Sequence, residues 1–184
     1  MLRQLCICSL VFLAVSTSTF AGGMVANLSV DLDGQVVLGD NYDNAMTIAP
    51  NLALVIDLVF SRTANSDVGL GVEYQKERPW FGEQTIQFTP IYGFINHYGS
   101  SRTRGPQPYL TGRLGYNYFS GPNSESTFIK SQGGLYYKLG LGLNFQNKFR
   151  IEANYSSSQG QEKTPLVTLD YTYNRTSICF GVVF

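Results

Sequence analysis

The sequence has few of the residues that build metal centres, disulfides and nucleic-acid interfaces. Its 184 residues include one histidine and three cysteines, and two of those cysteines, Cys6 and Cys8, lie near the start. One histidine and the remaining Cys179 are too few ligands for an ordinary zinc site, which uses four. Basic and acidic residues number 13 each, so charge does not indicate nucleic acid as a partner. We therefore expect no metal, no cofactor and no disulfide framework.

Long apolar runs are also scarce, and the one that exists stands at the beginning. Arg3 precedes the apolar run Leu5 to Val15, and small or polar residues follow as far as Ala21. The order of charge, apolar run and small residues is that of a secretory signal peptide. The run is shorter than the roughly 20 residues that a transmembrane helix needs. We predict a signal peptide over residues 1–21 and a single domain over residues 22–184.

Aromatic residues and glycine are abundant instead, with 12 Tyr, 12 Phe and 19 Gly. Apolar and polar residues alternate in segments of about ten residues, the length of a tilted strand that crosses a membrane. These segments are 24–33, 51–60, 67–75, 85–97, 108–119, 135–145, 149–155 and 166–184. No helical apolar period competes with them. The pattern predicts an all-β fold, an eight-stranded antiparallel transmembrane β-barrel with an up-and-down meander.

Two of these segments have ambiguous faces. In 85–97 we assign Ile86, Phe88, Tyr92 and Phe94 to the apolar, lipid-facing side, and Pro90 predicts an irregularity because it lacks a ladder donor. In 166–184 the apolar residues stand first at odd and then at even positions. We predict one long strand with a bulge near Asn174 and Arg175 that switches its faces. The alternative is a ninth strand that begins after a turn there.

The final residues form an amphipathic strand. Its apolar face is Ile178, Phe180, Val182 and Phe184, and small or polar residues lie opposite. A strand of this kind that ends on phenylalanine resembles the assembly signal of bacterial outer-membrane barrels. The whole sequence, including P-Y-L-T-G-R-L-G-Y-N-Y-F at 108–119, resembles the small OmpA/OmpX-type outer-membrane β-barrel family of Gram-negative bacteria.

The resemblance implies a bacterial outer-membrane location at the cell surface. It also implies three kinds of partner: outer-membrane lipid and lipopolysaccharide, the barrel assembly machinery, and a host or cell-surface ligand. With a periplasmic carboxy terminus, segments 34–50, 76–84, 120–134 and 156–165 are external and mostly longer than the periplasmic turns. Trp80 and Phe81 then lie in an external loop, as an anchor in the outer leaflet or as a contact for a partner.

Charged residues recur on the polar faces of the predicted strands and therefore point into the lumen. They are Asp31, Asp57, Glu73, Arg113, Lys138, Arg150 and Glu152. An eight-stranded barrel is narrow enough for side chains to fill its interior. These residues therefore predict a network of ion pairs that closes the lumen, and the alternative is a gated, porin-like narrow channel.

His97 is the candidate for catalysis. Its surroundings, Asn96-His97-Tyr98-Gly99-Ser100, invite comparison with lipid A deacylases, in which a serine stands two residues after the histidine. Here Gly99 stands at that position. The leading prediction is thus a non-enzymatic barrel with a filled lumen that presents surface loops for structural or adhesive roles. A lipid A-modifying enzyme and a narrow pore for ions or small apolar solutes are the alternatives. Convergence of His97 with a serine or an acid on one face of the barrel would favour the enzyme.

Overall fold

The computed structural model describes residues 22–39, 45–48, 50–80, 84–99, 105–122 and 129–184. The predicted signal peptide, residues 1–21, and Phe81 lie outside these ranges, so both of those predictions stay predictions. In the part of the chain that is described, no helix is long and apolar enough to cross a membrane.

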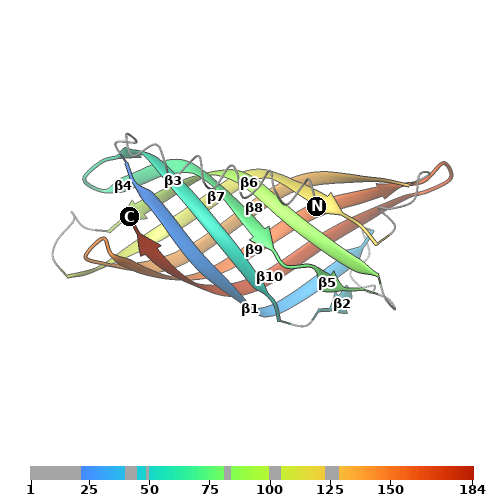
Figure 1. The fold of residues 1–184 in the computed structure, drawn as a ribbon, viewed down its shortest axis with the longest axis horizontal. Helices are drawn as coiled ribbons and strands as arrows, with labels where there is room; N and C mark the ends of the chain where they lie inside the picture. Colours follow the sequence, from blue (N-terminus) through green and yellow to red (C-terminus); the bar gives the residue numbers. More distant parts are fainter. Residues whose placement is uncertain (1–21, 40–44, 49, 81–83, 100–104, 123–128) are drawn as a thin grey trace.

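Eight long strands form one antiparallel meander (Figure 1). They are β1 (Met24–Leu38), β3 (Leu52–Arg62), β4 (Ser66–Gln75), β6 (Thr85–Tyr98), β7 (Pro106–Ser120), β8 (Lys130–Phe145), β9 (Phe149–Lys163) and β10 (Thr168–Val183). Two short strands, β2 (Ala45–Thr47) and β5 (Arg78–Pro79), pair with β1 and β6 near the loops. The predicted eight-stranded fold is confirmed.

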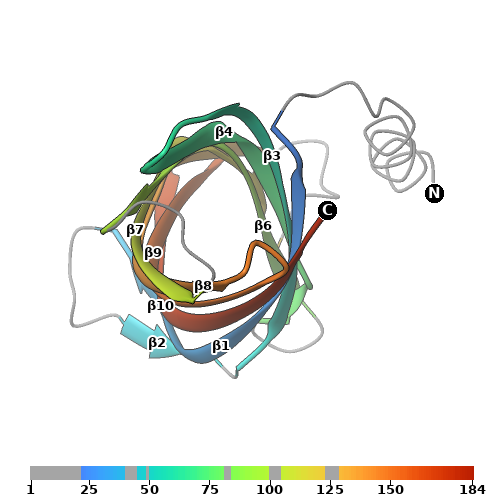
Figure 2. The same ribbon diagram turned by 90° about the vertical axis from the view of Figure 1, so that its left-hand side faces the viewer.

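The sheet closes on itself because β1 pairs with β10. Val25 lies opposite Val183, and the backbone groups of Met24 and Phe184 exchange two hydrogen bonds of 3.2 and 2.8 Å. Viewed along the barrel, the strands form a ring (Figure 2). A closed ring satisfies the backbone groups of its first and last strands, as hydrocarbon surroundings require.

The two ends of the barrel differ. The terminal end carries the start of β1 and the end of β10, and two of its three connections are turns of three residues. Its β8–β9 turn has three residues, 146–148, and Gln146 and Asn147 have positive φ angles that suit the twist of a tight hairpin. The loop end carries β2, β5 and the far reach of β9 and β10. Short turns and long loops assign the terminal end to the periplasm and the loop end to the exterior.

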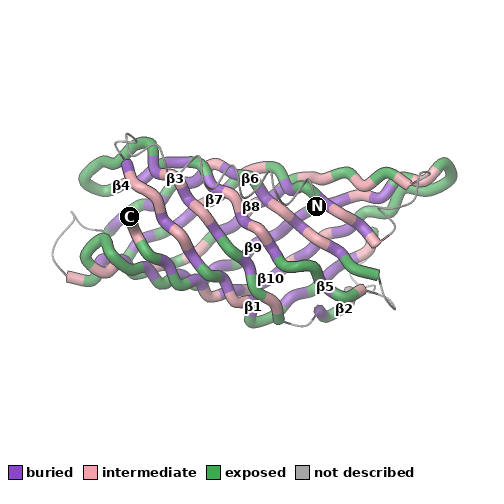
Figure 3. The backbone as a smooth tube through the Cα atoms, viewed as in Figure 1, coloured by how far each residue is buried: buried purple, intermediate pink, exposed green. Residues whose placement is uncertain are grey.

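Burial alternates along much of the length of the long strands (Figure 3). Leucines of the predicted lipid face are among the most exposed residues: Leu139 is 62% exposed and Leu141 is 64% exposed. Lys138, which precedes Leu139, and Glu152 of β9, which lies opposite Gly142, point the other way and are buried. An apolar exterior around a polar interior is the arrangement of a barrel that spans a bilayer.

The predicted face of 85–97 is wrong. Phe88, Tyr92 and Phe94 are buried inside, whereas Ile91 and Ile95 face outward.

The predicted bulge near Asn174 is also wrong, because β10 pairs with β9 without a shift from Thr168 to Val182. The register shift lies in β1 instead, between Asp31 and Asp33. Both errors have one cause: the lumen holds aromatic side chains, so an apolar side chain does not by itself mark the lipid face.

Strand β9 is longer than predicted. Segment 156–165 is mostly strand rather than loop, and β9 and β10 continue as a hairpin that turns at residues 164–167. This hairpin extends beyond the other loops (Figure 1).

Candidate functional site

The structure brings the predicted lumen charges together in three clusters along the barrel. In the central cluster, Arg113 lies between two carboxylates, with its Nη2 3.1 Å from Asp57 and 3.0 Å from Glu152. The hydroxyls of Tyr92 and Tyr109 donate to the same two carboxylates at 2.8 and 2.7 Å. All of these side chains are buried, and each charged group is in direct contact with a group of opposite charge.

The loop-end cluster is the largest. Asp31 accepts from Arg78 at 2.7 Å and from Arg175 at 2.6 Å. Arg175 also contacts Glu73, and Glu73 accepts from Lys138 at 2.6 Å. The amide of Gln75 joins the two halves, because it donates to Glu73 and accepts from Arg78, each at 2.9 Å.

The terminal-end cluster is built on Asp67. Its carboxylate pairs with Arg150 at 3.0 Å and with Arg62 at 3.3 Å. Tyr98 donates to the same carboxylate at 2.8 Å and accepts from Arg150 at 3.0 Å. The aspartate is therefore held between strands β3, β4, β6 and β9.

The seven predicted lumen residues all lie in these clusters, and three buried partners were missed: Asp67, Arg78 and Arg175. Together they make five acids and five bases. Arg175 stands on the same odd-numbered face as Ser177 and Cys179, and the predicted face switch hid this signal. Arg78 belongs to the short β5, where the sequence predicts a loop. Asp67 begins an alternating segment, but its partner Arg150 is 83 residues away.

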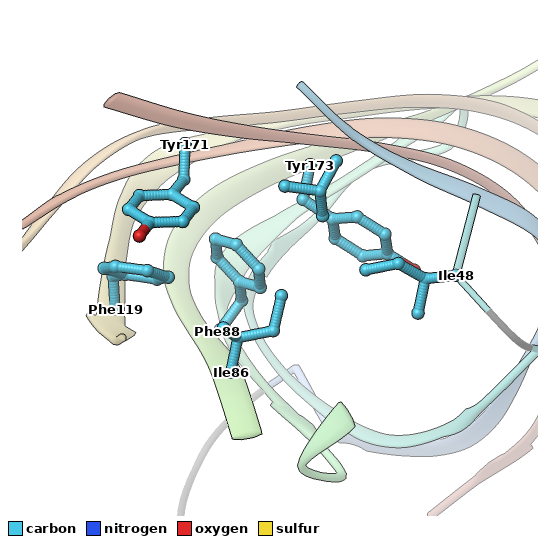
Figure 4. Close-up of a cluster of buried hydrophobic side chains, with 7 residues drawn as sticks. Ile48, Ile86, Phe88, Phe119, Tyr171 and Tyr173 are labelled. Carbon is cyan, nitrogen blue, oxygen red and sulfur yellow. The ribbon is translucent and has the colours of Figure 1, made fainter. Parts of the chain in front are cut away.

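At the loop end of the lumen, a group of aromatic and aliphatic side chains points inward (Figure 4). We call this group the aromatic cap; it contains Val36, Ile48, Ile86, Phe88, Phe119, Tyr171 and Tyr173. The rings of Phe88 and Tyr173 stack with their centroids 5.3 Å apart. Trp80, a predicted surface-loop contact, is half-buried and packs against the cap, 6.0 Å from Tyr171.

Tyr171 lies nearer to the loop end of the barrel than the outward-facing apolar residues of β10. Its hydroxyl donates a hydrogen bond to Glu162 at 3.0 Å. Burial and the neighbouring Glu162 carboxylate raise the pKa of the Tyr171 phenol above its ordinary value. The phenol therefore stays protonated and keeps donating this hydrogen bond, which ties the cap to the β9–β10 hairpin.

His97 lies on the outer face near the terminal end and is exposed. Its Nδ1 is 3.1 Å from the hydroxyl of Ser66, the residue opposite it on β4. Asp67, the next residue of β4, points into the lumen, where it pairs with Arg150. His97 and a serine thus converge on one face, although the serine is not the one near His97 in the sequence. The described residues contain no group of three or more histidine, cysteine, aspartate or glutamate side chains that could hold a metal ion.

The four assembly-signal residues occupy the outer face of β10 at the terminal end. Phe180 and Phe184 are exposed, and Ile178 and Val182 lie on the same face in register with β1 and β9. Phe184 sits directly at the β1–β10 seam through its backbone bonds with Met24.

Solved structures similar to this chain are small outer-membrane proteins. Neisserial surface protein A matches with a TM-score of 0.55 and 13% identity, over 88% of this chain and 97% of that one. The outer membrane enzyme PagL matches with a TM-score of 0.48 and 11% identity, over 85% and 98%. Ail, the attachment invasion locus protein of Yersinia pestis, matches with a TM-score of 0.47 and 15% identity, over 89% and 99%.

No protein-family model and no curated protein matches the sequence. Sequence identities this low show a shared fold but do not show a shared activity, because one fold serves many functions. Strand number, closure, apolar exterior and the likeness to Neisserial surface protein A agree. The chain therefore has the fold of the small eight-stranded β-barrel proteins of the bacterial outer membrane.

Proposed function

We propose that this protein is a non-enzymatic outer-membrane barrel that presents its external hairpins to a ligand at the cell surface. The observation that supports the proposal is the filled lumen. Three clusters of paired charges and the aromatic cap occupy the interior from one end to the other. A barrel whose interior is occupied in this way serves as a scaffold, and its function falls to the loops.

The β9–β10 hairpin is the best candidate for contact with a ligand. Thr164 holds its turn, because the Thr164 hydroxyl accepts from the backbone N–H of Val167 at 2.9 Å. The turn presents Leu166, which is 94% exposed. A rigid, exposed apolar side chain far from the membrane can bind a partner with little loss of conformational entropy.

The test compares bacteria that express the unchanged protein with bacteria whose hairpin tip, residues 163–168, is replaced by Asn-Gly. The probe is adhesion to a monolayer of cultured epithelial cells. We expect the shortened variant to fold and to lose most of the adhesion that expression confers, whereas Lys76→Ala, in another loop, keeps it. Equal adhesion of the shortened and unchanged proteins would contradict a role for this hairpin.

A second candidate function rests on the hydrogen bond between Ser66 and His97. A hydroxyl next to an imidazole is the minimal arrangement for nucleophilic attack on an ester, and these residues face lipid. Such an enzyme would act on lipid esters at the terminal end, away from lipid A in the external leaflet. Mass spectrometry of lipid A and phospholipids from cells with the native protein and with His97→Ala tests it. The leading proposal expects identical lipid profiles, and a change in acylation would favour the enzyme.

A further inference from the structure

The outer face of the barrel carries a groove of about 490 Å³ near the terminal end, across strands β6 to β9. Its lining is almost wholly apolar and includes Leu110, Leu141, Leu143, Ile151 and Ala153, with His97 at one side. The volume falls in the range of roughly 300–1,000 Å³ that is typical of small-molecule sites. The groove is therefore large enough for part of a lipid.

The sequence makes this groove by placing short side chains among tall ones. Strand register sets His97, Leu110, Leu141 and Ala153 side by side in one row across the strands. Pro108, Leu143 and Ile151 form the next row toward the terminal end. The short side chains of Ala153, between Leu141 and Ile178, and of Pro108, beside Leu143, leave the surface hollowed there. The row from His97 to Ala153 spans three strand spacings, or about 14 Å.

One end of this row is polar. Ser66 lies opposite His97 and forms the 3.1 Å hydrogen bond described above. The row therefore runs from a hydroxyl and an imidazole to a stretch of hydrocarbon, which is the polarity of a lipid molecule from its ester region to its acyl chain.

The position of the groove along the barrel axis agrees with this polarity. Phe145 and Phe149 lie opposite each other nearer to the terminal end, and Phe149 is exposed. Aromatic residues of this kind mark the interface between acyl chains and headgroups. The groove continues the lipid-facing surface, so the surrounding leaflet supplies its occupant.

We propose that this groove is a binding site for one phospholipid of the periplasmic leaflet, with an acyl chain along Leu110, Leu141 and Ala153 and its ester region at Ser66 and His97. This proposal goes beyond the proposed function and does not depend on it, because it concerns the opposite end of the barrel.

Photocrosslinking tests the proposal. The full-length folded protein is placed in vesicles of phosphatidylethanolamine and phosphatidylglycerol that contain a phosphatidylethanolamine with a diazirine on its acyl chain. After irradiation, mass spectrometry locates the labelled residues. We expect at least threefold more label on Leu110, Leu141 and Ile151 than on Leu54 and Leu70, which are exposed on the opposite wall.

Ala153→Phe fills the groove and should lower its labelling to the level of the opposite wall. The matched control is Ala26→Phe, an outward-facing alanine on β1, which should leave the labelling of the groove unchanged. Heat-modifiable mobility in gel electrophoresis verifies that each variant is folded. Even labelling around the unchanged barrel, or undiminished groove labelling in folded Ala153→Phe, would overturn the proposal.

Native mass spectrometry of the protein extracted from outer membranes identifies the occupant. A retained mass of one phospholipid, lost in Ala153→Phe and kept in Ala26→Phe, is the expected result. Retention of lipid A at this site would overturn the assignment to the periplasmic leaflet.

Discussion

At the scale of single residues, Arg113 is the basic residue that joins the two carboxylates of the central cluster. It forms ion pairs with both Asp57 and Glu152, and all three side chains are buried. Removing one partner of a buried ion pair leaves an unpaired charge and typically costs about 3–5 kcal/mol. We expect Arg113→Ala to lower the free energy of unfolding by about this amount.

Urea unfolding in lipid vesicles, followed by tyrosine fluorescence or gel mobility, measures the change. The control is Lys163→Ala, an exposed charge at the end of β9, which should have little effect. An equal effect of the two substitutions would contradict the idea that lumen pairing stabilises the barrel.

Leu139 tests which face meets the lipid. It stands near the middle of β8 and is 62% exposed. A charged side chain at the bilayer midplane destabilises a barrel by roughly 2–4 kcal/mol. Leu139→Arg should therefore reduce stability by about this amount in the same unfolding assay, whereas Leu166→Arg at the hairpin tip should be neutral. A neutral Leu139→Arg would mean that this face does not contact hydrocarbon.

At the scale of elements, β10 is the strand on which closure depends. It pairs with β9 along one edge and with β1 along the other, and Phe184 joins Met24 at the end of the seam. Deletion of Phe184 removes those last backbone bonds and the terminal aromatic of the predicted assembly signal. We expect less heat-modifiable, folded protein in the outer membrane, with Phe184→Tyr as the conservative control. An unchanged folded yield after the deletion would exclude this role.

The elements also mark where sequence patterns stop being informative. Alternation located all eight long strands, because each must show one face to hydrocarbon and the other to the lumen. It misassigned β6, since Phe88, Tyr92 and Phe94 are as apolar as a lipid-facing row but pack inside. It also hid the pairing of Asp67 with Arg150 and of Asp31 with Arg175, because partners across a lumen depend on register and closure, which local spacing does not encode. The hydrogen bond between Ser66 and His97 has the same origin: it joins residues 31 positions apart.

At the scale of the whole molecule, the filled lumen predicts electrical behaviour. Ion pairs lie inside the barrel at three levels, and the aromatic cap lies at the loop end. The purified protein in planar bilayers should therefore show little steady conductance. A variant that loses both Arg113 and Phe88 is the informative comparison, because it removes the ion pairs with Asp57 and Glu152 and part of the cap. Large, stable, ion-selective openings of the unchanged protein would place the pore alternative first.

The bonds between Met24 and Phe184 have a consequence for the order of events during folding. The first and last strands of the barrel are neighbours in space and about 150 residues apart along the chain, so the seam has the longest loop to close. Before the seam forms, β1 and β10 each have an edge with unpaired backbone N–H and C=O groups. These groups are unfavourable in hydrocarbon and can pair with strands of other chains. A slow, nearly all-or-none insertion step is therefore expected, in which no stable barrel of seven strands accumulates.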